Sequence, residues 1–519
     1  MALDPLLPMG SSSAAESTVD ELLTLATFGV YQRRQLSLCC ACFGMSAGAL
    51  LLPNLLLPRL WEAWELTEEE TAYLDSLFFA GNTIGLLAWG VVGDLFGRRP
   101  CACTALLLLM IGGGGTFACE SLESLMAMRT FTGFAVGGVM NATFLLVLEV
   151  CPPDARMTGK QALAIYGWVT GVFWVTGVAY LTQDATWRLL ALYMLPAPLL
   201  LAMMLLWLRE SPRFLLTSGR ADEAMAALVA LGRLNRSPLP PDASVKPIAA
   251  QSAGDYSGES SGGSSGESSG GSGSSGGSAC VTLWAKAAAL FAPSLRRPTV
   301  LVGLAWLSST SSYYGVVLAP PPFGDVDVYV QNALGGLLEL PAYMLLPTLG
   351  NRLGRSRAWA LFLLLCAGPL LIMALLRAED APDDAALMVL ALLARFGATG
   401  ASTICYVAAA EQWPTMSRNL GLGYGAALGR LGSILAPLTR LTPSPFAIIG
   451  LVGAIGALAA TGLPETKGRA IAETVQEGAV TATERQEAST STAEQPEASS
   501  SATKSRTMAD IELVGRQAE

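Results

Sequence analysis

Long apolar runs separated by short polar segments fill most of this chain. The runs lie at residues 36–57, 72–93, 101–119, 122–150, 161–181 and 187–208, and again at 299–318, 329–347, 358–376, 385–408, 421–438 and 445–463. A helix needs about 20 mostly apolar residues to cross a bilayer, which is close to the length of each run. The pattern therefore predicts an all-α membrane protein with twelve transmembrane helices in two groups of six.

The distribution of Lys and Arg between the predicted loops indicates an orientation. If the N-terminus is cytoplasmic, the loops on its side carry 21 Lys or Arg residues up to Arg469, against four in the loops on the other side. Cytoplasmic loops of membrane proteins carry such an excess of positive residues. We therefore expect both termini to be cytoplasmic.

Composition divides the chain further. Residues 250–279 are almost entirely Gly and Ser, which predicts a flexible linker, and the last 50 residues are poor in large apolar side chains, which predicts disorder. The expected organisation is a cytoplasmic N-terminal tail (1–30), a six-helix bundle (31–215), a cytoplasmic loop that contains the linker (216–296), a second six-helix bundle (297–469) and a disordered cytoplasmic tail (470–519).

Sequence landmarks recur at a nearly constant spacing in the two halves. The motif GDLFGRR after the second run is matched 257 residues later by GNRLGRS after the eighth. Glu149 and Arg156, at the end of the fourth run, recur 262 residues later as Glu411 and Arg418. These spacings predict that the second bundle is a structural repeat of the first.

Charge and composition exclude several classes of function. A net charge of −9 gives no basic surface for nucleic acid. The chain has no His, and its ten Cys form no CxxC pair, so we expect neither a metal site nor a disulfide scaffold. Without a Walker loop or a nucleophile elbow, we expect no nucleotide, no cofactor and no enzymatic activity. Because His is absent, any proton coupling must use carboxylates.

Several motifs make the chain resemble a known family. They are TFGVYQRRQLSL before the first run, ESPRFLLTSGRADEA after the sixth, SSYYGVVL in the seventh, GLLELPAY in the eighth, EQWPTMSRNLGLG and RLGSILAP around the eleventh, and LPETKGR after the last. With these motifs the chain resembles the major facilitator superfamily, in particular its organic cation/carnitine transporter branch and the neighbouring synaptic-vesicle-protein-related transporters. Sugar porters share ESPR and PETKG, but the paired glutamines of their seventh span are missing here.

Two ionisable residues lie near the middle of predicted spans. Arg430 is nine residues into the eleventh run, about 13.5 Å along a helix, which is close to the centre of a hydrocarbon core of about 30 Å. A guanidinium at that depth binds a substrate carboxylate through paired hydrogen bonds, or it forms a structural ion pair with Glu339 of the eighth run. The resemblance favours substrate contact, because relatives that handle anions and zwitterions carry Arg at this place.

The carboxylates in the predicted spans have two interpretations each. Glu339 is either a proton carrier and contact for a cationic group, or the partner of Arg430. Asp75, near the outer end of the second run, is a second candidate for coupling, although we expect it to be solvated.

Aromatic residues supply further candidate contacts for a substrate. A quaternary ammonium group binds to aromatic faces, and the seventh run is unusually polar around its tyrosines. The candidates are Tyr313, Tyr314, Tyr166 and Trp168, with Tyr343 and Trp174 beside them.

A third set of charged residues lies mostly at the inner ends of the spans. Salt bridges among them are expected to close the cytoplasmic side and to break when it opens. Two of them, Arg129 and Arg395, lie inside spans, and the resemblance implies that they support packing and gating. The set comprises Asp94, Arg98, Arg99, Arg129, Glu149, Arg156, Arg352, Arg355, Arg395, Glu411 and Arg418.

The sequence thus predicts a multi-pass protein of the plasma membrane or a vesicle membrane that moves a small organic ion, either a carboxylate or a carnitine-like zwitterion. Its expected partners are the lipid bilayer and the solute, with protons as a candidate coupling ion. One alternative is a transporter-like protein with a binding or vesicle-trafficking role and no flux, which the altered loop motifs at Leu95 and Asn351 favour. Another alternative is a sugar porter.

Overall fold

The computed structural model describes residues 16–241, 243–245, 290–293, 295–318, 327–378, 384–413 and 418–467. The predicted linker at 250–279 and the predicted tail at 470–519 lie outside the described residues.

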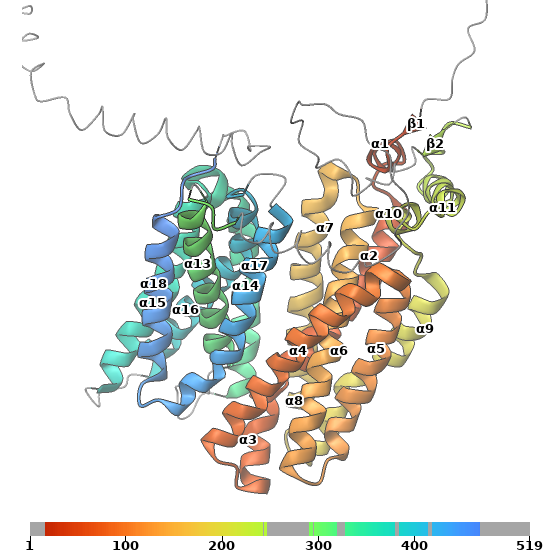
Figure 1. Ribbon diagram of the computed structural model, residues 1–519. Coiled ribbons are helices and arrows are strands. Elements are labelled where there is room, and N and C mark those ends of the chain that lie inside the picture. The colour runs from red at the N-terminus through yellow and green to blue at the C-terminus, as the bar shows by residue number, and fades with distance from the viewer. Residues whose placement is uncertain are drawn as a thin grey trace, which may run out of the picture.

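The first half of the chain forms one helical bundle (Figure 1). Its elements are α2 (Val30–Leu51), α3 (Pro53–Trp64), α4 (Glu68–Phe96), α5 (Arg98–Gly115), η1 (Thr116–Ala118), α6 (Leu122–Val150), η2 (Pro153–Ala155), α7 (Arg156–Ala162), η3 (Leu163–Val169), α8 (Thr170–Leu181), η4 (Trp187–Met194) and α9 (Ala197–Trp207). Helices α4 and α6 share the most extensive contact of this bundle.

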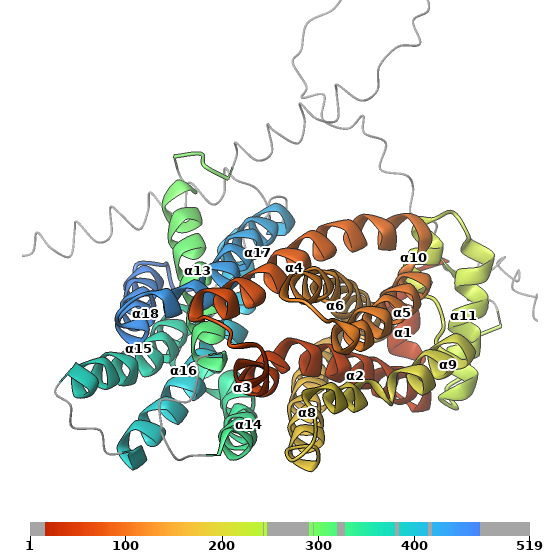
Figure 2. The same cartoon turned by 90° about the horizontal axis from the view of Figure 1, so that it is seen from below.

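The second half forms another bundle beside the first. Its elements are α13 (Arg296–Val317), α14 (Val328–Leu353), α15 (Arg355–Ala378), α16 (Asp384–Ala410), α17 (Arg418–Leu435), η5 (Pro437–Leu441) and α18 (Pro445–Thr461). The view from below shows α3 and α4 of the first bundle lying along the boundary with the second (Figure 2). Contacts of α4 with α17 and η5, and of α8 with α14, join the two bundles.

A small module covers one end of the first bundle. It consists of β1 (Glu16–Ser17), α1 (Val19–Leu25), α10 (Pro212–Thr217), α11 (Ala221–Leu234) and β2 (Ser244–Val245), with β1 and β2 paired in parallel. Apolar side chains of α1, α10 and α11 form a separate core, which includes Leu22, Leu215 and Leu228. We call this end of the molecule the tail end and the opposite end, where α3 lies, the α3 end (Figure 1).

Ten helices of the described chain are long and apolar enough to cross a membrane, and they coincide with the first ten predicted runs. The eleventh run forms α17, which is not among the ten, and the twelfth forms α18, which is apolar but has only 17 residues. The structure is therefore mostly helical, as expected, with α3 and the tail-end module as additions that the apolar pattern did not predict.

The fifth predicted span begins earlier in the structure than in the sequence analysis. Helices α7 and α8 are joined by η3, which has π-helical hydrogen bonding, so one helix runs from Arg156 to Leu181. Such π segments are frequent at functional sites. As a consequence Lys160, which the sequence placed in a loop, lies on this helix.

Close packing of α4 on α6 depends on glycine. A Cβ atom on Gly133 of α6 would lie 2.0 Å from the carbonyl oxygen of Phe78, and one on Gly81 of α4 would lie 2.0 Å from that of Thr130. Small residues allow such backbone contact between membrane helices. Glycines on both helices, Gly81 of α4 and Gly133 of α6, thus let the two helices come together.

Candidate functional site

The Glu339 carboxylate lies at the centre of a polar cluster in the second bundle. Its side chain is fully buried in α14, and its Oε1 accepts hydrogen bonds from Arg395 of α16 at 3.0 and 3.2 Å. The hydroxyls of Tyr313 and Tyr343 donate to the same carboxylate at 3.3 and 3.5 Å. Buried charges require such pairing, so this cluster holds both charges within the second bundle.

The alternative partnership of Glu339 with Arg430 is wrong for this structure. Arg395 forms the ion pair with Glu339 because α14 packs against α16. Arg430, in contrast, points from α17 toward the first bundle. There Arg430 donates a hydrogen bond of 2.8 Å to Oδ1 of Asn82 on α4. No carboxylate of the described residues lies within ion-pair distance of Arg430.

Aromatic side chains meet between the bundles beside these polar groups. The ring of Tyr314 lies 4.5 Å from that of Phe79 on α4, and the ring of Tyr313 lies 6.2 Å from that of Trp168 on η3. Three of the four predicted aromatic candidates are thus brought together. The fourth, Tyr166, is 66% exposed and makes no ring contact with this group.

The residues around Arg430 and Glu339 are related by the sequence repeat. Asn82 precedes Glu339 by 257 residues, the spacing of the loop motifs, and Trp168 precedes Arg430 by 262 residues. Across the boundary Asn82 meets Arg430, while Trp168 lies beside the Tyr313 that binds Glu339. Positions that the repeat relates therefore take part in contacts between the two bundles.

Asp75 is buried, contrary to our expectation that it is solvated. Its side chain is 1% exposed, and it forms an ion pair of 3.0 Å with Arg440. Arg440 lies on η5, which folds over this part of α4 and covers the carboxylate. Arg440 also donates to the carbonyl oxygen of Leu318, so one side chain joins α4, η5 and the end of α13.

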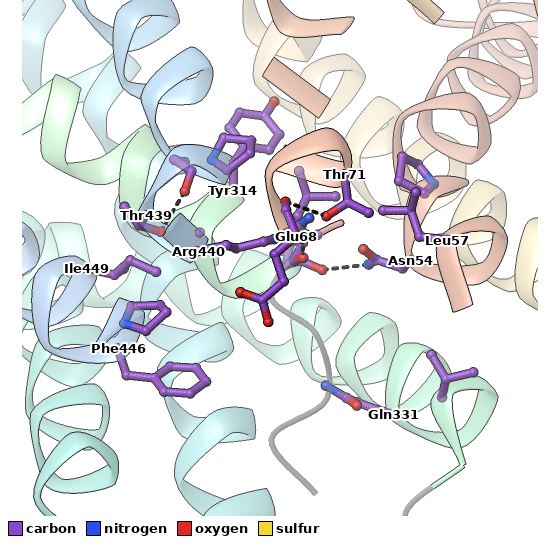
Figure 3. A pocket seen from close by; sticks show the side chains of 18 of the residues that line it. Asn54, Leu57, Glu68, Thr71, Tyr314, Gln331, Thr439, Arg440, Phe446 and Ile449 are labelled. Atoms are coloured by element: carbon purple, nitrogen blue, oxygen red, sulfur yellow. Dashed lines mark hydrogen bonds between the residues drawn. The ribbon is translucent and has the colours of Figure 1, made fainter. Parts of the chain in front are cut away.

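A cavity of about 750 Å³ lies between the bundles toward the α3 end (Figure 3). Residues of both bundles line it, including Asn54 and Trp61 of α3 and Tyr314, Arg395 and Arg440. The cavity therefore reaches from α3 to residues of the polar clusters described above.

Arg129 is the counterpart of Arg395 in the first bundle, but its surroundings differ. It is fully buried, donates to the carbonyl oxygen of Ala49 at 2.9 Å, and lies 4.4 Å from the ring centroid of Phe78. Its Nε and Nη2 have no hydrogen-bond partner among the described residues. Arg129 thus packs α6 against α2 and α4.

At the tail end of the first bundle, Arg98 connects three elements. It pairs with Asp94 at 3.0 Å and with Glu149 at 3.2 Å, while Glu210 accepts hydrogen bonds from the backbone N–H groups of Arg98 and Arg99. All of these residues belong to the first half of the chain.

The second bundle repeats this arrangement. Arg355 pairs with Glu411 at 3.4 Å, and its guanidinium also donates to Asn351 at 2.9 Å. Glu465 accepts from the backbone N–H of Arg355 at 2.8 Å. Arg352 contributes a backbone carbonyl that accepts from Lys467, and Arg418 begins α17. The ion pairs of Arg98 and of Arg355 thus each lie within one bundle.

Arg156 has a partner that the sequence analysis did not consider. It pairs with Asp20 of α1, and Asp20 also pairs with Arg213 of α10. The separation of Asp20 from both arginines along the chain gave no sign of this contact. Asn82 and Arg440 were also missed, although a lone asparagine inside an apolar run and an arginine followed by few polar residues are signals that could have found them.

Comparison with known proteins places these features in a family. Residues 28–267 match the family model described as sugar (and other) transporter. The chain is 30% identical to solute carrier family 22 member 7 of Sus scrofa, over 80% of this chain and 72% of that protein. It is 26% identical to organic cation/carnitine transporter 7 of Arabidopsis thaliana, over 82% of this chain and 88% of that protein.

The fold agrees with this assignment. The structure is similar to the partially occluded inward-open conformation of the xylose transporter XylE from E. coli, with a TM-score of 0.60, 16% identity, and coverage of 88% of this chain and 100% of that chain. The chain therefore belongs to the solute carrier 22 family, and it has the fold of major facilitator superfamily proteins.

Proposed function

We propose that this protein moves a small organic carboxylate across a membrane by alternating access, with a carnitine-like zwitterion as the second candidate. Arg430 carries this proposal. Its guanidinium is only partly buried, comes from one bundle, contacts the other bundle through Asn82, and has no carboxylate partner among the described residues. A carboxylate substrate supplies the missing charge through paired hydrogen bonds.

Because Glu339 is already paired, the site favours an anionic substrate over a cationic one. Arg395 already compensates Glu339 within the second bundle, so this carboxylate is not open to a cationic substrate without breaking a buried pair. A zwitterion remains compatible, because Tyr314, Phe79 and Trp168 offer aromatic faces for an ammonium group.

The membrane arrangement is part of the proposal. We infer that α17 and α18 complete twelve spans, that 31–215 and 297–469 act as two six-helix domains, and that the tail end with both termini is cytoplasmic. The excess of Lys and Arg in the loops of that end supports this orientation. The host membrane is the plasma membrane or a vesicle membrane.

The tail-end charge networks are proposed to stabilise each domain's cytoplasmic corner during the cycle. Arg98 and Arg355 hold equivalent helix junctions, and both junctions lie at the end where the substrate leaves or enters in this orientation. Rearrangement of such networks provides a two-state element, since ion pairs repack when rigid bodies rotate.

Purified protein in proteoliposomes tests the carboxylate contact. Arg430→Gln is expected to lower carboxylate uptake by at least tenfold, whereas Arg430→Lys keeps the charge, loses the paired geometry and retains partial uptake. Thermal unfolding of each variant checks folding. Uptake that is unchanged in Arg430→Gln excludes the carboxylate contact, and competition by hexoses but not by carboxylates supports a sugar porter instead.

Proton coupling is tested separately at Glu339. If Glu339 carries the proton, uptake by Glu339→Gln no longer responds to an imposed pH gradient. The double variant Glu339→Gln/Arg395→Gln serves as the control for folding, because it removes both charges of the buried pair. A gradient response that persists in Glu339→Gln excludes this role and leaves facilitated transport.

A further inference from the structure

Lys160 is a cation at the bundle boundary to which the proposed function assigns no role. It lies on α7 in the first bundle, four residues after that helix begins, and its side chain is partly exposed. Its Nζ lies 4.9 Å from the ring centroid of Tyr406 on α16 in the second bundle. Lys160 is thus a side chain that reaches from one bundle to the other on the tail-end side.

The charge of Lys160 is not compensated by an acid in the described part of the chain. No ion pair or hydrogen bond of its ammonium group is found there, and the contact that it makes is with the face of Tyr406. An aromatic face attracts a cation but leaves its hydrogen-bond donors unsatisfied. An ammonium group in such a place is expected to bind an anion that the structure does not contain.

The aromatic contact connects Lys160 with the Arg430 region. Tyr406 is 43% exposed, and its ring lies 4.9 Å from that of Trp306 on α13. Trp306 in turn packs on α17 so closely that a Cβ on Gly429 would lie 2.7 Å from its ring. Gly429 directly precedes Arg430, so Tyr406 and Trp306 form a chain of contacts from Lys160 to the segment of α17 that carries Arg430.

We propose that Lys160 is a second contact for the anionic group of the substrate, supplied by the first bundle on the tail-end side of Arg430. The two cations come from opposite bundles, and neither has an acidic partner among the described residues. A carboxylate that leaves Arg430 toward the tail end meets Lys160 next, which makes this half of the passage selective for anions. This inference rests on the proposed carboxylate transport.

Ligand binding to the purified full-length protein tests the assignment. Benzoate is the anionic probe, and benzamide and benzyltrimethylammonium are the neutral and cationic probes of similar size. Stabilisation against thermal unfolding reports binding to the folded state. Lys160→Met is expected to raise the benzoate concentration for half-maximal stabilisation by about tenfold at low salt and less at high salt. The response to the other two probes is expected to stay within about twofold of the wild type.

A charge-retaining variant distinguishes loss of the positive charge from other effects of the substitution. Lys160→Arg is expected to bind benzoate within about threefold of the wild type, because it keeps the positive charge. If Lys160→Met binds benzoate as the wild type does, or Lys160→Arg loses as much as Lys160→Met, the inference is overturned.

Arg430→Gln separates this inference from the proposed function. Loss of benzoate binding in Arg430→Gln together with unchanged binding in Lys160→Met overturns only the role of Lys160. If the wild type shows no response to benzoate, or if neither substitution alters it, the carboxylate function and the role of Lys160 both fail.

Discussion

The ion pair of Asp75 with Arg440 joins the two bundles in an environment from which water is largely excluded. Asp75 lies on α4 of the first bundle and Arg440 on η5 of the second, and both side chains are mostly buried. Removing one partner of a buried pair leaves an uncompensated charge, which is costlier than removing both. The pair is therefore a sensitive probe of contact between the bundles at this depth.

Substitution of Asp75 tests this contact. Asp75→Asn is expected to lower the free energy of unfolding by about 3 kcal/mol, because Arg440 stays buried without its counter-charge. The double variant Asp75→Asn/Arg440→Gln is expected to recover part of that loss. Denaturant unfolding in detergent measures these two variants and the single variant Arg440→Gln. Equal stability of Asp75→Asn and the wild type contradicts a buried pair, and a double variant that loses the sum of both single effects contradicts coupling.

At the residue level, the sequence was informative about depth and not about partnership. Position along the predicted spans placed Arg430 and Glu339 near mid-membrane, whereas in the structure Arg430 contacts Asn82 of the first bundle and Glu339 is bound within the second. The choice of Arg395 over Arg430 as partner of Glu339 depends on which helices pack together, and span order alone does not specify that. Asp75 was misjudged because η5, which covers it, is short and carries no apolar periodicity of its own.

Two helix junctions have the same backbone structure. One joins α4 to α5 and the other joins α14 to α15. Gly97 and Gly354 end the first helix of each pair with φ angles of +105° and +100°. A Cβ on Gly354 would lie 2.2 Å from a carboxylate oxygen of Glu465, the residue that caps the next helix. These sites need glycine both for the backbone conformation and for space.

Gly354→Ala is expected to destabilise the second bundle by about 1–3 kcal/mol, because alanine is strained at this φ and displaces the Glu465 carboxylate. Thermal unfolding measures the loss. The matched control is Gly423→Ala on α17, where nothing lies within 4 Å of a new Cβ and alanine favours the helix. A stability loss that is equal in the two variants argues against a special role for the junction.

Glu465 gives the same junction a dependence on pH. Burial raises the pKa of its carboxyl group, but hydrogen bonds from the backbone N–H groups of Arg355, Lys467 and Thr466 outweigh that effect and hold the pKa below its ordinary value. The ionised carboxylate therefore stabilises the fold fully above the ordinary pKa near 4.5, and this contribution is lost as the pH falls through the lowered pKa.

Glu465→Gln is accordingly expected to be less stable than the wild type by about 1 kcal/mol at pH 6, with a difference that shrinks toward zero as the pH falls below 4. Unfolding across this pH range measures the difference. Glu120→Gln, which alters an exposed loop carboxylate, is the control and is expected to show no such change. A wild-type advantage that persists undiminished at low pH contradicts a role for the ionised form.

Apolar patterning predicted the long helices but not how their ends are built. The first ten runs became helices of membrane-spanning length because their composition alone requires burial in lipid or protein. The start of the α7–η3–α8 helix was misplaced, since Lys160 interrupts the apolar pattern without ending the helix. The α1 helix was missed because its apolar face is short and is buried in a small core with α10 and α11.

For the molecule as a whole, polar contacts between the bundles gather on the side of the α3 end. Arg59 of α3 donates to the carbonyl oxygen of Ala179 at 2.6 Å and to the hydroxyl of Tyr329 at 3.0 Å, which links α3 to both bundles. Ser76 of α4 donates to the carbonyl oxygen of Ile434 on α17 at 3.0 Å. If transport proceeds by alternating access, these contacts must break in every cycle, because the α3 end has to open.

A reversible cross-link tests that requirement directly. The variant Ser76→Cys/Ile434→Cys places two thiols where α4 and α17 touch. In the wild type the hydroxyl of Ser76 already donates a hydrogen bond to the backbone carbonyl oxygen of Ile434. Oxidation is expected to lower flux in proteoliposomes to below about a tenth of the reduced level, and reductant is expected to restore it. The single variants control for oxidation of the native cysteines, which are buried in the described chain. Full flux through cross-linked protein means that the α3 end need not open, which rules out the rocking of two rigid bundles. A block of flux that reductant reverses shows instead that separation of the two bundles at this end is a step of the cycle.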